Sequence, residues 1–160
     1  MSTEEKKPLQ FSWPEESKGY VDFHQNIILL YGIPKIGKTT LASNFPDALF
    51  FDTERGTKHQ KIKGWYVSSW TDFLMRLDML ETANRLNEIP FKTIIIDTVD
   101  RLIDYCEQFT CNKLGINVLS DVEFGKAHSQ NTKEFRKQLN RIISIGLGLV
   151  FVSHATEKEI

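Results

Sequence analysis

The segment from Gly32 to Thr39 (GIPKIGKT) has the residue types and the spacing of a phosphate-binding loop, G-x-x-x-x-G-K-S/T. The two glycines let the backbone curl until successive N–H groups point at phosphate oxygens, and a following helix presents its positive end to the same anion. Lys38 would bridge the β and γ phosphates, and the Thr39 hydroxyl would bind Mg²⁺. The motif therefore predicts a site for ATP or another nucleoside triphosphate with Mg²⁺.

We expect nine consecutive residues to form this binding segment, namely Gly32, Ile33, Pro34, Lys35, Ile36, Gly37, Lys38, Thr39 and Thr40. Thr40 is available to help position the α phosphate. Pro34 has no N–H to donate, but it occupies a variable position of the loop. Lys35 is expected to be a surface charge. The alternative is an ordinary turn between a strand and a helix, with an exposed lysine.

An aspartate follows another apolar run. Residues 93–96 (TIII) are expected to form a buried strand, and Asp97 stands at its carboxyl end. Beside the phosphate loop, this carboxylate would hold the hydration shell of Mg²⁺. An aspartate in this position can instead cap a helix, but the phosphate loop in the same chain favours the metal role. Guanine recognition requires N-K-x-D, and residues 112–115 (NKLG) lack the final aspartate, which disfavours a GTPase.

Two further predicted strands end in groups that could take part in hydrolysis. Glu54 follows the apolar run 48–51, and it is our candidate for the base that orients the attacking water; Asp52 is the alternative base. Glu54 could instead pair with a nearby arginine or lysine. His154 follows the run 149–152 and could donate a hydrogen bond to the γ phosphate. In the alternative interpretation, His154 only caps the edge of the sheet and does not contact a phosphate.

Short apolar runs alternate with longer helical patterns along the chain, which is typical of an α/β fold whose parallel sheet is covered by helices on both faces. The uninterrupted apolar composition of the runs predicts strands buried on both faces. We expect strands at residues 26–31, 48–51, 65–67, 93–96 and 149–152, and helices at 38–44, 69–87, from about 100, and 127–145.

Three local features add detail to the expected helices and to the segment between the last two. Ser69 followed by Asp72 resembles a capping box. In the last helix, a buried stripe is expected to consist of Phe135, Leu139, Ile142 and Ile143. Residues 112–125 are expected to form a loop long enough to have a function.

The composition fits one globular domain of 160 residues with a net charge of -1, and it argues against a highly basic protein that coats DNA. We expect a polar tail at residues 1–24 and one domain at 25–160. Cys106 and Cys111 have no partners at zinc-ligand spacing, which favours reduced thiols. The sequence has no secretion signal and no apolar run of membrane-spanning length, so we expect a cytoplasmic protein without membrane contact.

Taken in order, residues 32–40, Phe51 to Glu54, Ile94 to Thr98 and Val150 to His154 resemble the RecA-like ATPase core, a three-layer fold of the P-loop NTPase class. The resemblance covers most of residues 26–156. It implies that Glu54 is the catalytic base, that Asp97 ends the Walker B strand and is followed by a small hydroxyl residue, and that His154 ends the sensor strand. Bacterial RecA has glutamine at this last position.

A closer resemblance is to phage-encoded AAA-type nucleotide-binding proteins, including the single-strand annealing proteins of the Sak group. It is carried by residues 31–35 (YGIPK), 52–57 (DTERGT) and 124–126 (FGK). It implies that ATP orders a homo-oligomer that handles single-stranded DNA in the host cytoplasm. Two basic stretches could contact DNA phosphates; they are Arg55, Lys58, His59, Lys61 and Lys63, and Lys126, Lys133, Arg136, Lys137 and Arg141.

RecA-like cores usually continue beyond the sensor strand, whereas the sequence ends at Ile160, so we expect a trimmed or a minimal variant. Phosphoryl transfer in this class often depends on a cation from a neighbouring subunit. We therefore expect slow ATP hydrolysis in isolation, with Arg55, Arg101 and Arg136 as substitutes that the spacing does not distinguish. Three functions stay open: a recombination or annealing ATPase, a nucleotide-binding switch or assembly factor with little hydrolysis, and a small-molecule kinase.

Overall fold

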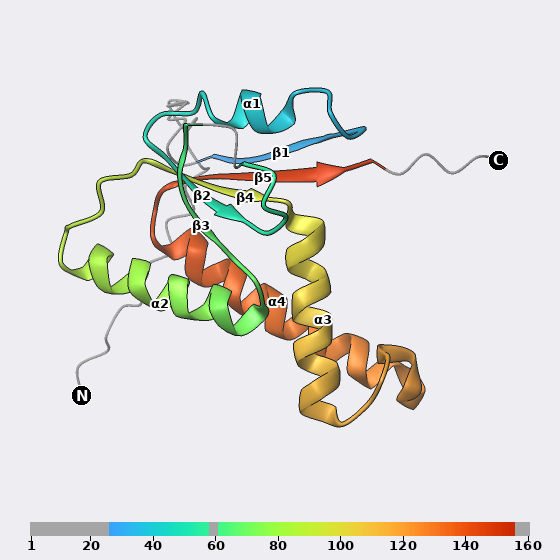
Figure 1. The fold of residues 1–160 in the computed structure, drawn as a ribbon. Helices are drawn as coiled ribbons and strands as arrows, with labels where there is room; N and C mark the ends of the chain where they lie inside the picture. The colour runs from blue at the N-terminus through green and yellow to red at the C-terminus, as the bar shows by residue number, and fades with distance from the viewer. Residues whose placement is uncertain (1–25, 58–60, 156–160) are drawn as a thin grey trace, which may run out of the picture.

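A computed structural model describes residues 26–57 and 61–155 (Figure 1). The expected tail at 1–24 lies outside the described residues. The elements run in the order β1 (Ile27–Gly32), α1 (Lys38–Ala42), β2 (Ala48–Asp52), β3 (Lys63–Tyr66), α2 (Trp70–Arg85), β4 (Thr93–Asp97), α3 (Val99–Leu114), the 3-10 helices η2 (Leu119–Asp121) and η3 (Glu123–Gly125), α4 (Lys126–Ser144) and β5 (Gly148–His154).

The five strands form one sheet in the order β1-β5-β4-β2-β3, and every neighbouring pair is parallel. This confirms the expected α/β fold. The last strand of the series, β5, lies between the first strand and β4. Because all strands point the same way, their carboxyl ends meet at one edge, where Gly32 is paired with His154 and Asp52 with Asp97.

The two faces of the sheet are packed by alternate residues of the central strands. Phe50, Ile95 and Val150 pack with Ala42 of α1, whereas Phe51 and the other alternate positions pack with α2, α3 and α4. Figure 1 shows α1 on one side of the sheet and the three longer helices on the other. The arrangement has three layers, as the sequence predicts.

The strand β1 differs from its expected burial on both faces. Its alternate residues Ile27, Leu29 and Tyr31 are 56, 60 and 71% exposed. β1 is an edge strand whose one described strand neighbour is β5, and its other side chains, Ile28 and Leu30, pack towards α1. The prediction failed because an uninterrupted apolar run does not reveal whether a strand lies at the centre of a sheet or at its edge.

Three other local expectations need correction. The Ser69 hydroxyl accepts the Asp72 N–H at 3.1 Å, but the Asp72 carboxylate accepts the N–H of Ser68 instead of Ser69, so the capping box is incomplete. Ile143 is 41% exposed, whereas Gln138 is buried in the stripe of α4. The expected loop at 112–125 contains the end of α3 and the two 3-10 helices.

The two cysteines are free and buried, which agrees with the expected reduced thiols. Burial raises the pKa of the Cys106 thiol to about 12, so the reactive thiolate is disfavoured at neutral pH. No helix among the described residues is long and apolar enough to cross a membrane.

Arg141 joins α4 to α2 through two carboxylates. Its guanidinium donates to Glu81 at 2.8 and 2.6 Å and to Asp78 at 2.6 Å. We expect Arg141→Met to lower the free energy of unfolding at pH 7 by about 1 kcal/mol, since partly exposed ion pairs contribute little. Urea unfolding measures this change, and Arg136→Met, on an exposed residue of the same helix, should leave the stability unchanged.

The loss should depend on pH. The hydrogen bond from Arg141 lowers the pKa of Glu81 below its ordinary value of 4.5. A carboxyl with a lowered pKa in the folded state stabilises the protein above its unfolded pKa, and this contribution disappears as the pH falls through the folded pKa. The difference between wild type and Arg141→Met should therefore shrink below about pH 4.5. A difference that stayed constant down to pH 3 would contradict this electrostatic account.

Candidate functional site

The candidate phosphate loop connects the end of β1 with the start of α1. Gly37, which precedes the helix, has a φ of 93°, a left-handed conformation that favours glycine. The ammonium of Lys38 lies back over the loop and donates to the carbonyl oxygens of Gly32 at 2.7 Å and Ile33 at 2.9 Å. Lys38 is buried, so its charge is held at the loop itself. By contrast, five other residues of the predicted segment have exposed side chains, namely Ile33, Pro34, Lys35, Ile36 and Thr40.

Thr39 and Asp97 meet at the carboxyl edge of the sheet. The Thr39 hydroxyl donates to a carboxylate oxygen of Asp97 at 2.6 Å, although the two residues come from different elements. The pKa of Asp97 is raised above its ordinary value, chiefly by burial. The hydrogen bond from Thr39 opposes this rise, and the nearby carboxylates of Asp52 and Glu54 add to it. A divalent cation here would offset this concentration of negative charge.

The donor set of this contact fits magnesium. Mg²⁺ prefers oxygen ligands and keeps several water molecules, so one carboxylate and one hydroxyl are a typical protein contribution beside substrate phosphates. Thr39 and Asp97 would hold the ion, and the ion would neutralise charge on the phosphates. Groups of three or more histidine, cysteine or acidic residues at metal-binding distances do not occur in the described ranges.

Asp52 shapes the turn that carries Glu54. One carboxylate oxygen accepts the Glu54 N–H at 3.0 Å, and the other accepts both the N–H and the hydroxyl of Thr57. Asp52 is buried and its two oxygens are engaged within the turn. This arrangement favours Glu54 over Asp52 as the group that reaches a substrate.

The Glu54 carboxylate lies between two polar groups at the same edge. One oxygen accepts the hydroxyl of Thr98 at 2.8 Å, and the other is 3.4 Å from Nε2 of His154. Its described partners are thus a threonine and a histidine, not the arginine or lysine that the alternative interpretation required. The side chain remains 42% exposed, so a water molecule or a phosphate has access to it.

His154 connects the phosphate loop with Glu54. Its Nδ1 atom is 3.2 Å from the Lys38 ammonium, and its Nε2 atom faces the Glu54 carboxylate. An ammonium can only donate and a carboxylate can only accept, so a neutral ring with its proton on Nε2 satisfies both contacts. The imidazole therefore lies within reach of both the cation and the carboxylate of the candidate site.

Two residues to which the sequence alone assigned no role, Thr53 and Asp100, hold this group together. The carboxylate of Asp100, in the first turn of α3, accepts the hydroxyl of Ser153 at 2.9 Å and the N–H of His154 at 2.8 Å. The Thr53 hydroxyl donates to the Thr98 carbonyl at 3.0 Å. These partners are far apart in the sequence, and the only available signal was that their segments all follow predicted strands.

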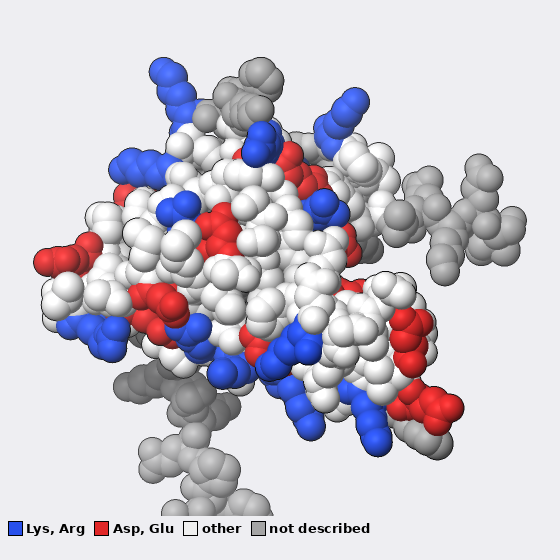
Figure 2. All heavy atoms as spheres, turned by 60° about the horizontal axis from the view of Figure 1, so that its bottom comes forward, with Lys and Arg blue, Asp and Glu red and all other residues white. Residues whose placement is uncertain are grey.

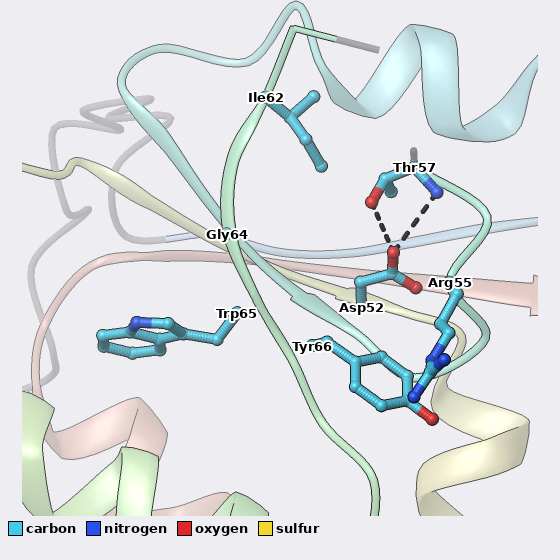
Figure 3. A pocket seen from close by; sticks show the side chains of 7 residues that line it. All are labelled: Asp52, Arg55, Thr57, Ile62, Gly64, Trp65 and Tyr66. Atoms are coloured by element: carbon cyan, nitrogen blue, oxygen red, sulfur yellow. Dashed lines mark hydrogen bonds between the residues drawn. The ribbon is translucent and has the colours of Figure 1, made fainter. Parts of the chain in front are cut away.

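A pocket of about 390 Å³ lies beside the Asp52 turn (Figure 3). Figure 3 shows Ile62 and Thr57 above it, Gly64 on β3, and the guanidinium of Arg55 next to the ring of Tyr66, while Trp65 points away from them. The Arg55 guanidinium carbon is 4.2 Å from the centre of the Tyr66 ring. Arg55 is therefore held against β3, beside the pocket.

The comparison with known families identifies the domain. A model of the AAA domain family matches residues 24–160, which is most of the chain. The chain belongs to this family. An AAA domain is a P-loop domain of the nucleotide-binding ATPase type, in agreement with the loop, the parallel sheet and the acidic residues described above.

The AAA domain is also similar to the "SPbeta prophage-derived uncharacterized protein YorG" of Bacillus subtilis (strain 168). The two sequences are 26% identical over 135 residues, which cover 82% of this chain. The same alignment covers 41% of the relative, so the AAA domain matches less than half of that protein.

Proposed function

We propose that this AAA domain is a RecA-like ATPase that hydrolyses Mg-ATP to ADP and phosphate and acts on single-stranded DNA in phage recombination or annealing. The observation that carries the ATPase part is the assembly of Lys38, Thr39, Asp97, Glu54 and His154 at one sheet edge, with Thr39 and Asp97 in direct contact. In this proposal, Lys38 binds the β and γ phosphates and Thr39 and Asp97 hold Mg²⁺.

Glu54 is the proposed base that orients the attacking water. Its hydrogen bond to Thr98 fixes one oxygen, and its exposed position leaves the carboxylate open to solvent. His154 is the proposed sensor, because a phosphate that attracted the Lys38 ammonium would change the partner of Nδ1. The ring can donate to the phosphate only with its proton on Nδ1, and a shift of the proton from Nε2 to Nδ1 would remove the hydrogen bond to Glu54.

The action on DNA and the assembly into a homo-oligomer rest on the resemblance to phage annealing proteins, together with a relative whose name describes it as prophage-derived. We place this action in the cytoplasm of the host cell. Slow turnover in isolation is expected because phosphoryl transfer in this class often depends on a cation from a neighbouring subunit. Of the three candidate cations, Arg55 lies over the ring of Tyr66 and Arg101 pairs with Asp104, whereas Arg136 is exposed and forms no ion pair within the described residues.

A nucleotide-binding switch with little hydrolysis is the second candidate function. It is favoured by one observation: both oxygens of Glu54 already have partners, and one of these partners, His154, also contacts Lys38. Such a group can report the presence of ATP without cleaving it. The two functions differ in turnover and not in nucleotide affinity.

The deciding experiment measures three properties of the purified chain. They are phosphate release from ATP, mass by light scattering with an ATP analogue, and both quantities again with oligo-dT. The proposed function predicts turnover or oligomer growth that oligo-dT stimulates. Tight ATP binding with neither effect would support the switch, and phosphorylation of a small acceptor by the monomer without DNA would indicate a kinase.

A further inference from the structure

A second hollow lies between the C-terminal half of α3 and the middle of α4, and we call it the α3–α4 groove. Its volume is about 310 Å³. Residues three, four and seven positions apart share one face of a helix. The lining residues have these spacings, so one face of α3 and one face of α4 line the groove. The lining residues used below are Phe109 and Lys113 from α3, and Gln130, Lys133, Glu134 and Lys137 from α4.

The α3–α4 groove is positively charged. Lys113, Lys133 and Lys137 are exposed, and none of them forms an ion pair with another residue in the described ranges. The groove lining also contains the carboxylate of Glu134, one oxygen of which accepts the N–H groups of Trp70 at 3.2 Å and Gln138 at 2.8 Å, so the lining has three positive charges and one negative charge. In a chain whose net charge is -1, this is a local concentration of unpaired positive charge.

Figure 2 brings the bottom of the view in Figure 1 forward, and it shows lysine and arginine side chains along the lower part of this face as well as on its upper part, with acidic side chains between them. Not all of these cations are available to a ligand. Arg141 of α4 is engaged by Asp78 and Glu81, and Arg101 of α3 pairs with Asp104. The three groove lysines therefore differ from Arg101 and Arg141 in forming no ion pair within the described residues, and Glu134 is the acidic residue that lines the groove beside them.

We propose that the α3–α4 groove binds the phosphate backbone of single-stranded DNA, an inference that rests on the DNA part of the proposed function. Lys133 and Lys137 are one helical turn apart on α4 and Lys113 lines the same groove from α3, so both sides of the groove offer ammonium groups to successive phosphates of a backbone. The half-buried ring of Phe109 adds an aromatic surface for an unpaired base.

The position of α3 connects the groove with the nucleotide site. The helix has 16 residues, about 24 Å in length, and its N-cap is Thr98, whose hydroxyl donates to Glu54. Asp100, in its first turn, holds the end of β5. Lys113 stands in its last turn. DNA bound in the groove would thus contact the same rigid element that positions the candidate base, and we expect it to raise ATP turnover.

The test measures fluorescence anisotropy of a labelled oligo-dT with the full chain, with and without an ATP analogue, over a range of salt concentrations. Replacing Lys133 and Lys137 by alanine should weaken binding about tenfold and reduce the slope of log K against log salt by about 1.4, since each lost phosphate contact on a single strand contributes about 0.7. Lys113→Ala should weaken binding independently from the other helix.

A matched pair separates the groove from general charge. Lys137→Glu and Arg136→Glu change the same charge at adjacent exposed positions of α4, but Arg136 does not line the groove. The proposal expects at least a fivefold larger loss of affinity for Lys137→Glu, with unchanged circular dichroism. Equal losses for the two variants, or a duplex that binds as tightly as oligo-dT, would overturn it.

Phosphate release without DNA, measured in the same preparations, distinguishes failure of the groove from failure of the function. ATP turnover together with oligo-dT binding that the lysine variants leave unchanged would overturn the groove and leave the ATPase proposal standing. A wild-type chain that neither hydrolyses ATP nor binds oligo-dT would overturn both. Groove variants that retain basal turnover but lose its stimulation by oligo-dT would support both.

Discussion

Lys38→Ala should weaken ATP binding at least about a hundredfold, because each charge-assisted hydrogen bond to a phosphate contributes about 1.5–3 kcal/mol. The position of Lys38 explains why this loss of ATP affinity should be specific to that residue. The ammonium is buried at the loop, it contacts the Gly32 and Ile33 carbonyls, and its neighbour Thr39 contacts Asp97. Isothermal titration with a non-hydrolysable ATP analogue measures the affinity.

The matched control is Lys35→Ala, which removes the same charge from an exposed position of the same loop. This variant should bind the analogue within about threefold of wild type, since an exposed charge contributes less than about 1 kcal/mol. Thermal melting of both variants checks that the fold is intact. A folded Lys38→Ala protein with wild-type affinity would show that the phosphates bind elsewhere.

Glu54→Gln should retain ATP binding and lower the turnover number about 10²- to 10³-fold, as expected when a positioned general base is removed. Glutamine keeps the size of the side chain and can still accept the hydroxyl of Thr98, but it cannot take a proton from water. Single-turnover phosphate release with saturating Mg-ATP measures the chemical step directly. Glu88→Gln, at an exposed position outside the site, is the control and should not change the rate.

The outcome also separates the two candidate functions. If wild type releases phosphate and Glu54→Gln does not, Glu54 acts in the chemical step. Unchanged release would assign the base to another group, and the engagement of both Asp52 oxygens makes that residue a poor replacement. If wild type itself releases no phosphate but binds ATP tightly, the contacts of His154 with Lys38 and Glu54 are better explained as a switch.

The sequence predicted the fold class and the segments of the site for one physical reason. The carboxyl ends of neighbouring parallel strands must meet at one edge of the sheet, and Gly32, Asp97 and His154 stand at these ends. The types of these residues suggested the chemistry, and the structure brings Lys38, Thr39, Asp97, Glu54 and His154 together. Their proposed roles stay predictions until the variants are measured.

Other properties depend on contacts between segments that the sequence does not rank. Five apolar runs do not show that β5 lies between β1 and β4, nor that one face of β1 is exposed. Thr98 and Asp100 were recognisable as the start of a helix, but their partners Glu54 and His154 come from distant strands. The α3–α4 groove was not predicted because Lys113 was assigned to a loop and Lys133 to a helix, and only the fold places them in the lining of one groove.

The position of β5 has a consequence for the order in which this protein is completed during synthesis. The strand that carries the phosphate loop is paired with β5, the last strand of the described chain to leave the ribosome. Contacts between such distant segments form slowly, because a long loop must close before they contribute stability. A nascent chain that has not released residues 148–154 therefore lacks the ladder partner of β1, and it should acquire ATP binding only when synthesis of the domain is nearly finished.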